Sequence, residues 1–240
     1  MTHPLVLEVR AALEKAADSA KAPKMQAYMK SAMPYRGVSG PEQKAIWRRL
    51  FQAHPLSSRA EWQTVALALW RGAAFREERY AAIALTDLRA YAAHRTMASM
   101  PMFEEMIVSG AWWDFVDAIA THHLGDVLRV DRFGMSKLMR RWSKGSDMWK
   151  RRAAILCQIR SKRETDLALL YDCIESNLSD DSTRTRDGSL MASQFFIRKA
   201  IGWALRQYAW VDAREVTRYV RKNRGRLSNL SVREALKNVG

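Results

Sequence analysis

The residues with the clearest chemical potential lie in the segment 112–117, which reads WWDFVD. Trp113 and Asp117 are four residues apart, so on a helix they share one face and place an aromatic plane beside a carboxylate. Asp114 suits the start of a helix, where a carboxylate caps the backbone or complements the helix dipole. The spacing therefore indicates Trp113 and Asp117 as candidate chemical groups and leaves Trp112 for packing. A purely structural role for Asp117 stays open.

Other catalytic motifs are missing from the sequence. There is no glycine-rich phosphate loop, serine-nucleophile elbow or metalloprotease motif. Cys157 and Cys173 do not form a CxxC pair, and clustered histidines that would complete a metal site with them are lacking. His122 and His123 are adjacent, so on a helix they point about 100° apart. We therefore expect neither a metal ion nor a cofactor.

The charge of the chain points to a polyanionic partner. Its 240 residues carry a net charge of +15, and the pI is about 10.2. Residues 1–120 hold 15 Lys/Arg against 12 Asp/Glu, whereas residues 121–240 hold 25 against 13. This asymmetry indicates one concentrated basic surface, for DNA, RNA or an acidic membrane surface. A basic surface that serves solubility alone is the alternative.

Helical periodicity runs through most of the chain, while glycine and proline are sparse and strand patterns are nearly absent. We expect an all-α protein of about a dozen helices with short connections. The predicted helices are Pro41–His54, Ser58–Trp70, Phe75–Ala93, Pro101–Val108, Asp114–Val130, Asp147–Ser161, Thr165–Asn177, Gln194–Ala209, Ala213–Lys222 and Ser231–Val239. The polar segment 179–193 is predicted to be a loop within a single domain that spans 1–240.

A recurring motif suggests how these helices are organised. Trp149-Lys-Arg-Arg152-Ala-Ala-Ile resembles Phe196-Ile-Arg-Lys199-Ala-Ile-Gly, and weaker copies occur near Tyr80 and Leu230. Each copy places a large apolar residue three positions before a basic one, followed by small residues that let helices approach closely. The recurrence at roughly fifty residues predicts a HEAT-like helical repeat array, an α-solenoid. Coincidence among alanine-rich helices is the alternative.

The N-terminal segment lacks the basic start and long apolar stretch of a signal peptide. Nor does the sequence contain a run of about 18 apolar residues that could cross a membrane. We expect a soluble, cytoplasmic protein without a membrane partner.

Several motifs match, in order, those of one known family. They are Tyr28-Met29-Lys30, Gly37-Val38-x-x-Pro41-Glu42, Trp112-Trp113-Asp114-x-x-Asp117, Trp149-x-x-Arg152-Ala-Ala-Ile-Leu and Phe195-Phe196-Ile-x-Lys199-Ala-Ile-Gly-Trp203-x-Leu-Arg206-x-Tyr208. On these motifs the chain resembles the AlkD-type DNA alkylation repair glycosylases, from about residue 4 to residue 238. The segment around 179–193 looks longer than in the family, which leaves DNA contacts there open.

The resemblance implies a HEAT-like array whose concave basic face holds duplex DNA carrying alkylated bases. The substrates it implies are cationic N3- and N7-alkylpurines, such as 3-methyladenine and 7-methylguanine, cut out by a monofunctional, monomeric glycosylase. It also implies that the lesion stays stacked in the duplex, whereas most glycosylases flip the target base. The implied catalytic residues are Asp117, Trp113 and Trp203, with Arg152 nearby and Tyr28 at the edge of the cleft.

Basic side chains would supply affinity for phosphates, which carry no sequence information. The candidates for DNA binding beside Arg152 and Tyr28 are Arg198, Lys199, Arg206 and Arg218. Arg218 belongs to a stripe with Arg214, Arg221 and Lys222 at three- or four-residue spacing. Solvation is the alternative for each arginine taken alone.

The implied chemistry agrees with the residue types. An alkylated purine is already cationic, so it leaves without a strong general acid, and the oxocarbenium-like sugar remains to be stabilised. One ionised carboxylate can stabilise that sugar and position water. Aromatic faces attract positive charge by about 0.5–2 kcal/mol each. Asp117 with Trp113 and Trp203 fits such a lesion.

Two other functions remain as alternatives. The first is a non-catalytic HEAT-like module that binds duplex or structured DNA, and the second is a helical scaffold for other proteins. Base release from DNA separates the glycosylase from the module. Failure to bind duplex DNA at low salt would favour the scaffold.

Overall fold

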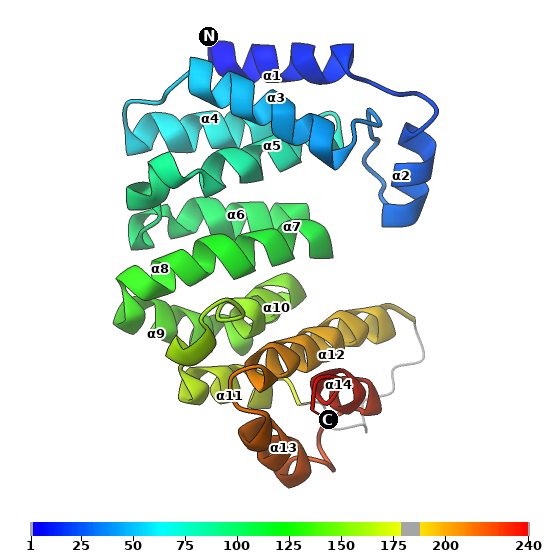
Figure 1. The fold of residues 1–240 in the computed structure, drawn as a ribbon, viewed down its shortest axis with the longest axis vertical. Coiled ribbons are helices and arrows are strands. Elements are labelled where there is room, and N and C mark those ends of the chain that lie inside the picture. The colour runs from blue at the N-terminus through cyan, green and yellow to red at the C-terminus, as the bar shows by residue number, and fades with distance from the viewer. Residues whose placement is uncertain (1, 179–187, 240) are drawn as a thin grey trace. The chain divides into compact units, whose positions relative to one another are not determined.

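The structure is a computed structural model that describes residues 2–178 and 188–239, with the side chains of 188–194 left aside. Within these residues the chain forms fourteen α-helices and no β-strand (Figure 1), which confirms the all-α fold predicted from the sequence. The arrangement is consistent with a helical repeat solenoid. The chain divides into two compact units, residues 1–94 and 95–240.

The first unit packs its helices around an apolar core. Its elements are α1 (Pro4–Lys15), α2 (Ala22–Met29), α3 (Gly40–Ala53), α4 (Arg59–Arg71), α5 (Arg76–Asp87) and the 3-10 segment η1 (Arg89–His94). A capping box of Ser39 and Glu42 starts α3, and the Ser58 side chain caps α4. Leu5, Trp62 and other apolar side chains of these helices are buried. The segment between α2 and α3 carries its own anchor.

That anchor is the fully buried carboxylate of Glu77 on α5. It accepts hydrogen bonds from the backbone N–H groups of Arg36, Gly37 and Val38, at 2.9 to 3.3 Å. Asp18 donates its own backbone N–H to the Arg36 carbonyl at 2.8 Å. Gly37 has φ +85°, and a Cβ there would lie 2.1 Å from the Asp18 carbonyl oxygen. Only glycine fits this position.

Gly37→Ala is expected to destabilise the protein by at least about 2 kcal/mol, because it combines an unfavourable φ with a clash against backbone. Urea unfolding monitored by circular dichroism measures the change. Gly40→Ala is the matched control, since a Cβ on Gly40 meets no atom within 4 Å. Equal stability of the two variants would contradict the steric role of Gly37.

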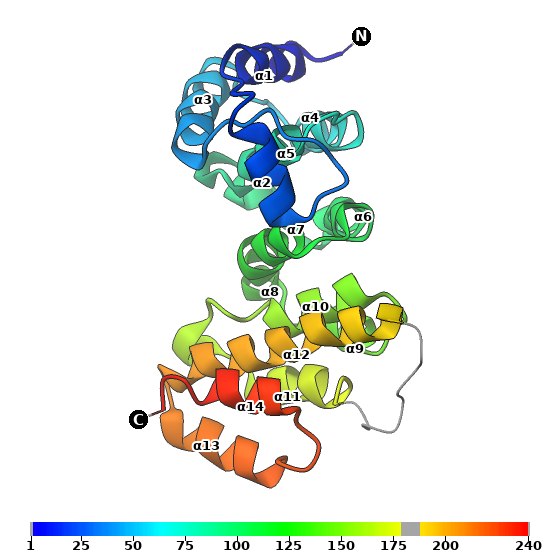
Figure 2. The ribbon, with the colours of Figure 1, turned by 90° about the vertical axis from the view of Figure 1, so that its right-hand side faces the viewer.

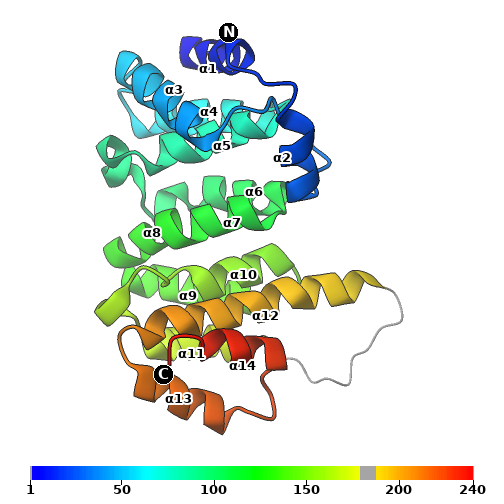
Figure 3. The same ribbon diagram turned by 45° about the vertical axis from the view of Figure 1, so that its right-hand side comes forward.

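The second unit holds the segment 112–117. Its elements are η2 (Met97–Ser99), α6 (Met100–Gly110), α7 (Trp113–Ala118), the π-helix η3 (Ile119–Leu124), α8 (Gly125–Val130), α9 (Arg132–Ser143), α10 (Met148–Leu156), η4 (Lys162–Glu164), α11 (Leu167–Glu175), α12 (Gly188–Ala209), α13 (Ala213–Lys222) and α14 (Asn229–Ala235). Helices α7, η3 and α8 follow one another as a continuous rod (Figure 3). Helix α10 packs against α6, α7, α9 and α12.

Helix α12 lies directly against α14 (Figure 2). Gly202 marks the closest approach, because a Cβ there would lie 2.5 Å from the Cβ of Glu234 and 3.1 Å from the Ser231 carbonyl oxygen. This agrees with the small residues that follow the basic position in the repeated motif. A bulkier residue at 202 would push the two helices apart.

Each of the ten predicted ranges overlaps a helix, but the boundaries and continuity differ. The predicted helix Asp114–Val130 is interrupted by the π-helix η3, and Phe75–Ala93 is helix only to Asp87 before the 3-10 segment η1. Helices α1, α2 and α9 were not predicted. The predicted loop 179–193 is corrected at its end, because residues 188–193 belong to α12, while 179–187 lie outside the described residues.

None of the helices within the described residues is long and apolar enough to cross a membrane.

Candidate active site

The two adjacent tryptophans lie at the turn between α6 and α7. Ala111 ends α6 in the left-handed conformation with φ 43°, and Trp112 follows as an extended N-cap residue. The Trp112 ring packs against Trp149 and Phe196, with centroids 6.2 and 5.7 Å away. Trp112 thus has the packing role expected from its position. Trp113 is the first residue of α7 and is partly exposed.

One turn further along α7, Asp117 forms a bidentate ion pair with Arg152 of α10. Arg152 Nε donates to Asp117 Oδ1 and Nη2 donates to Oδ2, both at 2.7 Å. Arg152 Nη1 donates to the backbone carbonyl of Phe196 on α12. The side chains of Asp117 and Arg152 are 14% and 6% exposed. The guanidinium therefore joins three helices around one nearly buried carboxylate.

The protonation of Asp117 depends on opposing influences. Burial raises the pKa of this carboxyl, and the nearby negative charge of Asp114 raises it further. The hydrogen bonds and positive charge of Arg152 lower the same pKa. Arg152 is thus the group that favours the ionised form in a site where desolvation opposes it. An ionised carboxylate with few water contacts interacts strongly with neighbouring positive charge.

Trp113 and Trp203 are the two predicted aromatic residues of the site, and each lies on a helix to which Arg152 donates hydrogen bonds. Trp113 lies four residues before Asp117 on α7, so the two share a helical face about 6 Å apart along the axis. Trp203 lies seven residues after Phe196 on α12, which places it on the same face of that helix two turns away. Both tryptophans are partly exposed. A direct approach of Trp203 to Asp117 stays a prediction.

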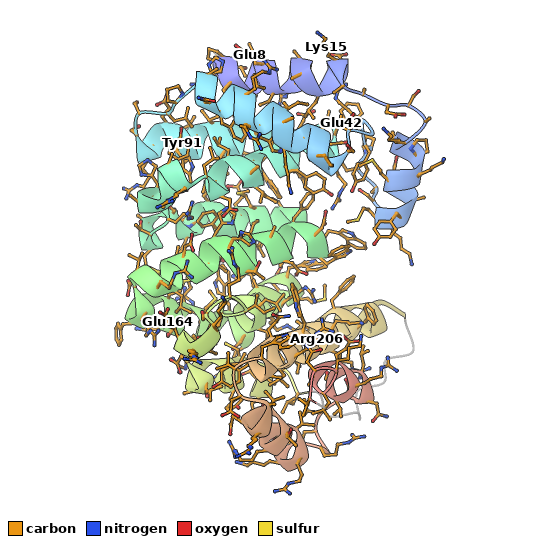
Figure 4. The ribbon with its side chains drawn as sticks, viewed as in Figure 1. Glu8, Lys15, Glu42, Tyr91, Glu164 and Arg206 are labelled. Carbon is orange, nitrogen blue, oxygen red and sulfur yellow. The ribbon has the colours of Figure 1, made fainter. Side chains whose placement is uncertain are left out.

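The predicted DNA-binding residues Lys199 and Arg206 are held within the protein by one acid. Glu234 of α14 accepts from Arg206 Nη1 at 2.6 Å, and it pairs with Lys199 Nζ at 3.3 Å and Lys237 Nζ at 3.2 Å. Arg206 lies on α12 where this helix passes α14 (Figure 4). Burial raises the pKa of Glu234, but Lys237 and Lys199 together lower it below the ordinary value. Three positive charges against one negative charge leave this cluster cationic.

The other predicted DNA-binding residues are Arg218, Arg198 and Tyr28, and they differ in their surroundings. Arg218 of α13 forms a bidentate pair with Glu215 at 2.6 and 2.7 Å, which offsets its charge. Arg198 is half-buried, and its backbone carbonyl accepts from Ser231 Oγ at 2.9 Å. Tyr28 is 80% exposed on α2, in the first unit. DNA binding by these residues stays a prediction.

The guanidinium of Arg152 is used mostly within the protein. Three of its donors are used inside the protein, by Asp117 and by the Phe196 carbonyl, and the residue is almost buried. Only two of its five N–H groups remain for a phosphate. In this structure Arg152 holds the carboxylate of Asp117, and DNA binding by Arg152 stays a prediction.

Sequence reasoning missed two aromatic residues and one acid of the site. Trp149 and Phe196 pack together at a centroid distance of 5.1 Å and form the apolar wall beside Arg152. They are the large residues of the two best copies of the repeated motif, so that repetition was a usable signal. Glu234 had no such signal, because only the packing of α14 on α12 brings it to Lys199 and Arg206.

The arrangement can stabilise a positive charge next to Asp117 and hold a water molecule there. A nearly buried carboxylate held in place by a fixed guanidinium supplies this effect with little reorganisation. The neighbouring aromatic faces add attraction for cations. Among the described residues, no group of three or more His, Cys, Asp or Glu side chains is placed to hold a metal ion.

Comparisons with known proteins show the family of this chain. A family model described as DNA alkylation repair enzyme matches residues 9–239. The fold is similar to a solved structure described as a predicted DNA alkylation repair enzyme from Enterococcus faecalis, with a TM-score of 0.79 and 26% identity, covering 93% of this chain and 97% of that one. The search of curated proteins gave no match. The family model spans nearly the whole sequence, and the chain therefore belongs to the DNA alkylation repair enzyme family.

Proposed function

We propose that this protein is a monofunctional DNA N-glycosylase that removes cationic N3- and N7-alkylated purines from duplex DNA. The observation that carries the proposal is the Asp117–Arg152 pair, which holds a nearly buried carboxylate one turn from Trp113. Membership in the DNA alkylation repair enzyme family supports alkylated DNA as the substrate, and the narrower class of cationic purines rests on the resemblance. Monomeric action with the lesion left stacked in the duplex is part of the proposal and rests on the resemblance.

In the proposed reaction the bond between C1′ and the purine nitrogen breaks, and its electron pair neutralises the cationic base. Asp117 stabilises the positive charge that develops on the sugar. A water molecule then bonds to C1′ through its oxygen and gives up one proton to Asp117 or to solvent. The products are a neutral alkylpurine and an abasic site. The leaving base needs no proton, which agrees with a site built around one carboxylate.

Positive charge on the lesion also explains the aromatic residues. Trp113 and Trp203 offer faces that attract a cation, and this attraction weakens when the base becomes neutral. The interaction therefore favours the damaged base over an undamaged one. The cationic cluster of Lys199, Arg206 and Lys237 around Glu234 is proposed to contact phosphates, with an affinity that falls as salt rises.

The direct test is base release by the purified protein from methylated duplex DNA. We expect free 7-methylguanine or 3-methyladenine, identified by mass spectrometry, together with an equal number of abasic sites. A series that extends to bulkier N7 adducts tests whether the lesion remains stacked. Tight binding of the same DNA without any free base would overturn the proposed activity.

One observation favours a second candidate, a non-catalytic module that binds DNA. Both carboxylate oxygens of Asp117 accept from Arg152, as in a purely structural ion pair. In that case the pair would only tie α7 to α10. The base-release experiment separates the two functions, because the module binds methylated DNA without changing it.

A further inference from the structure

The first turn of helix α9 carries an aromatic side chain that is exposed to solvent. Phe133 is 85% exposed and its neighbour Val130 is 68% exposed. The Asp131 side chain caps α9 by accepting from the Gly134 backbone N–H at 2.8 Å, which fixes this first turn. The preceding residue, Arg132, donates from Nη2 to the carbonyl of Glu164, a residue that is labelled in Figure 4.

Cations continue from Phe133 along one face of α9 and onto Lys144, the residue that caps the C-terminal end of this helix. Phe133, Lys137, Arg140 and Lys144 follow at spacings of four, three and four residues, so they form a stripe about 16 Å long. Lys137 and Lys144 are exposed, and within the described part of the chain neither forms an ion pair. Arg140 pairs with Asp172 at 2.6 Å. The stripe is therefore cationic with an aromatic ring at one end.

A hollow of about 540 Å³ lies beside the ring. It is lined by Arg132, Phe133, Ser136, Lys137 and Arg140. No carboxylate contributes to this lining. The Oγ of Ser136 is buried and has no hydrogen-bond partner among the described residues. The hollow thus combines an aromatic face with positive charge.

This combination suits a nucleotide better than an apolar partner. Proteins bind single-stranded nucleic acid by stacking bases on aromatic side chains and tracking the backbone with cations. A partner helix or a membrane would require more apolar surface than Phe133 and Val130 provide. We propose that Phe133 and the basic stripe of α9 form a binding site for single-stranded DNA, with a base stacked on Phe133 and phosphates along Lys137 and Lys144.

The proposed site is separate from the candidate active site. Asp117 and Val130 lie on the continuous rod of α7, η3 and α8, whose rise over that interval is about 20 Å. The nucleotide that stacks on Phe133 therefore cannot be the nucleotide whose sugar faces Asp117. The inference goes beyond the proposed glycosylase activity, because it assigns a contact to an unpaired strand that base release from duplex DNA does not require.

The test measures the affinity of the full-length protein for a fluorescent oligodeoxythymidylate of about 16 nucleotides, by anisotropy at low salt. Phe133→Ala is expected to raise the Kd at least about five-fold, the factor that corresponds to losing one stacked base. Phe133→Tyr should retain the affinity and Phe133→Leu should lose it, because stacking needs a ring. Lys137→Gln and Lys144→Gln should each reduce the salt dependence by about 0.7 in log–log slope.

Two further measurements separate this site from the proposed function. Base release from methylated duplex DNA should be unchanged in Phe133→Ala, whereas Asp117→Asn should lose release and keep the oligonucleotide affinity. Leu7→Ala, also an exposed apolar side chain, is the matched control and should change neither. Unaltered oligonucleotide binding by Phe133→Ala would overturn the site. Full retention of oligonucleotide affinity by Phe133→Leu would also overturn the site. The same holds if Phe133→Ala weakens binding to phosphatidylglycerol vesicles more than binding to the oligonucleotide.

Discussion

Asp117→Asn is expected to lower the rate of alkylpurine release by about 10²- to 10³-fold, the usual effect of removing one preorganised electrostatic group from an active site. The amide is uncharged, so it no longer stabilises the sugar cation or accepts a proton from water. Affinity for methylated duplex DNA should remain, because removal of one negative charge does not weaken phosphate contacts. Single-turnover base release and DNA-binding titrations measure the two effects.

The same substitution also leaves the buried charge of Arg152 without its counter-ion. A loss of stability of about 3 kcal/mol is expected from breaking such a pair on one side. Asp117→Asn/Arg152→Gln should regain part of the stability but none of the activity, which separates folding from chemistry. Asp114→Asn is the matched control, with the same chemical change one turn away, and should keep most of its activity. Undiminished release by Asp117→Asn would rule out its assigned role.

Arg152→Gln is expected to move the acid limb of base release to higher pH. Without the guanidinium, burial and Asp114 both raise the pKa of Asp117, and nothing comparable lowers it. The carboxylate is then ionised only at higher pH. A pH profile of single-turnover release measures the shift. Arg151→Gln removes the adjacent arginine of α10 and should leave the profile unchanged.

Stability provides a second measure of the Arg152 effect. The pKa of Asp117 is raised, which means that this carboxyl binds a proton more readily in the folded protein than in the unfolded chain. At pH values above the ordinary pKa of 3.8, burial of Asp117 therefore lowers the free energy of unfolding. The cost grows as pH rises from there through the folded pKa, and it is greater without Arg152. The stability gap between wild type and Arg152→Gln should therefore narrow on acidification. A gap that is constant with pH would show that Arg152 does not control the charge of Asp117.

Helical structure could be predicted from the sequence because its signals are local. Ser58, Asp147 and Asp212 each accept a backbone N–H at a helix start, and such caps are visible as residue types before an apolar period. The π-helix η3 gave no comparable signal. Nearly all residues of 119–125 are buried, so the pattern that distinguishes one face of a helix from another is lost there.

The candidate site could be predicted only in part, for a physical reason. Trp113 and Asp117 belong to one helix, so their spacing was sufficient to place them together. The pairing of Asp117 with Arg152, and of Glu234 with Arg206, depends on which helices pack side by side. The resemblance pointed to Arg152 near the site, but it did not show that its guanidinium would be used on the carboxylate.

The bond from Arg152 to the Phe196 carbonyl has a consequence during synthesis of the chain. Arg152 reaches 35 residues back to Asp117 and 44 residues forward to Phe196. A nascent chain that has not yet released α12 from the ribosome can hold the carboxylate and the arginine, but it lacks the carbonyl that completes their geometry. The Asp117–Arg152 pair therefore reaches its final geometry only after α12 has been synthesised and has packed against α10.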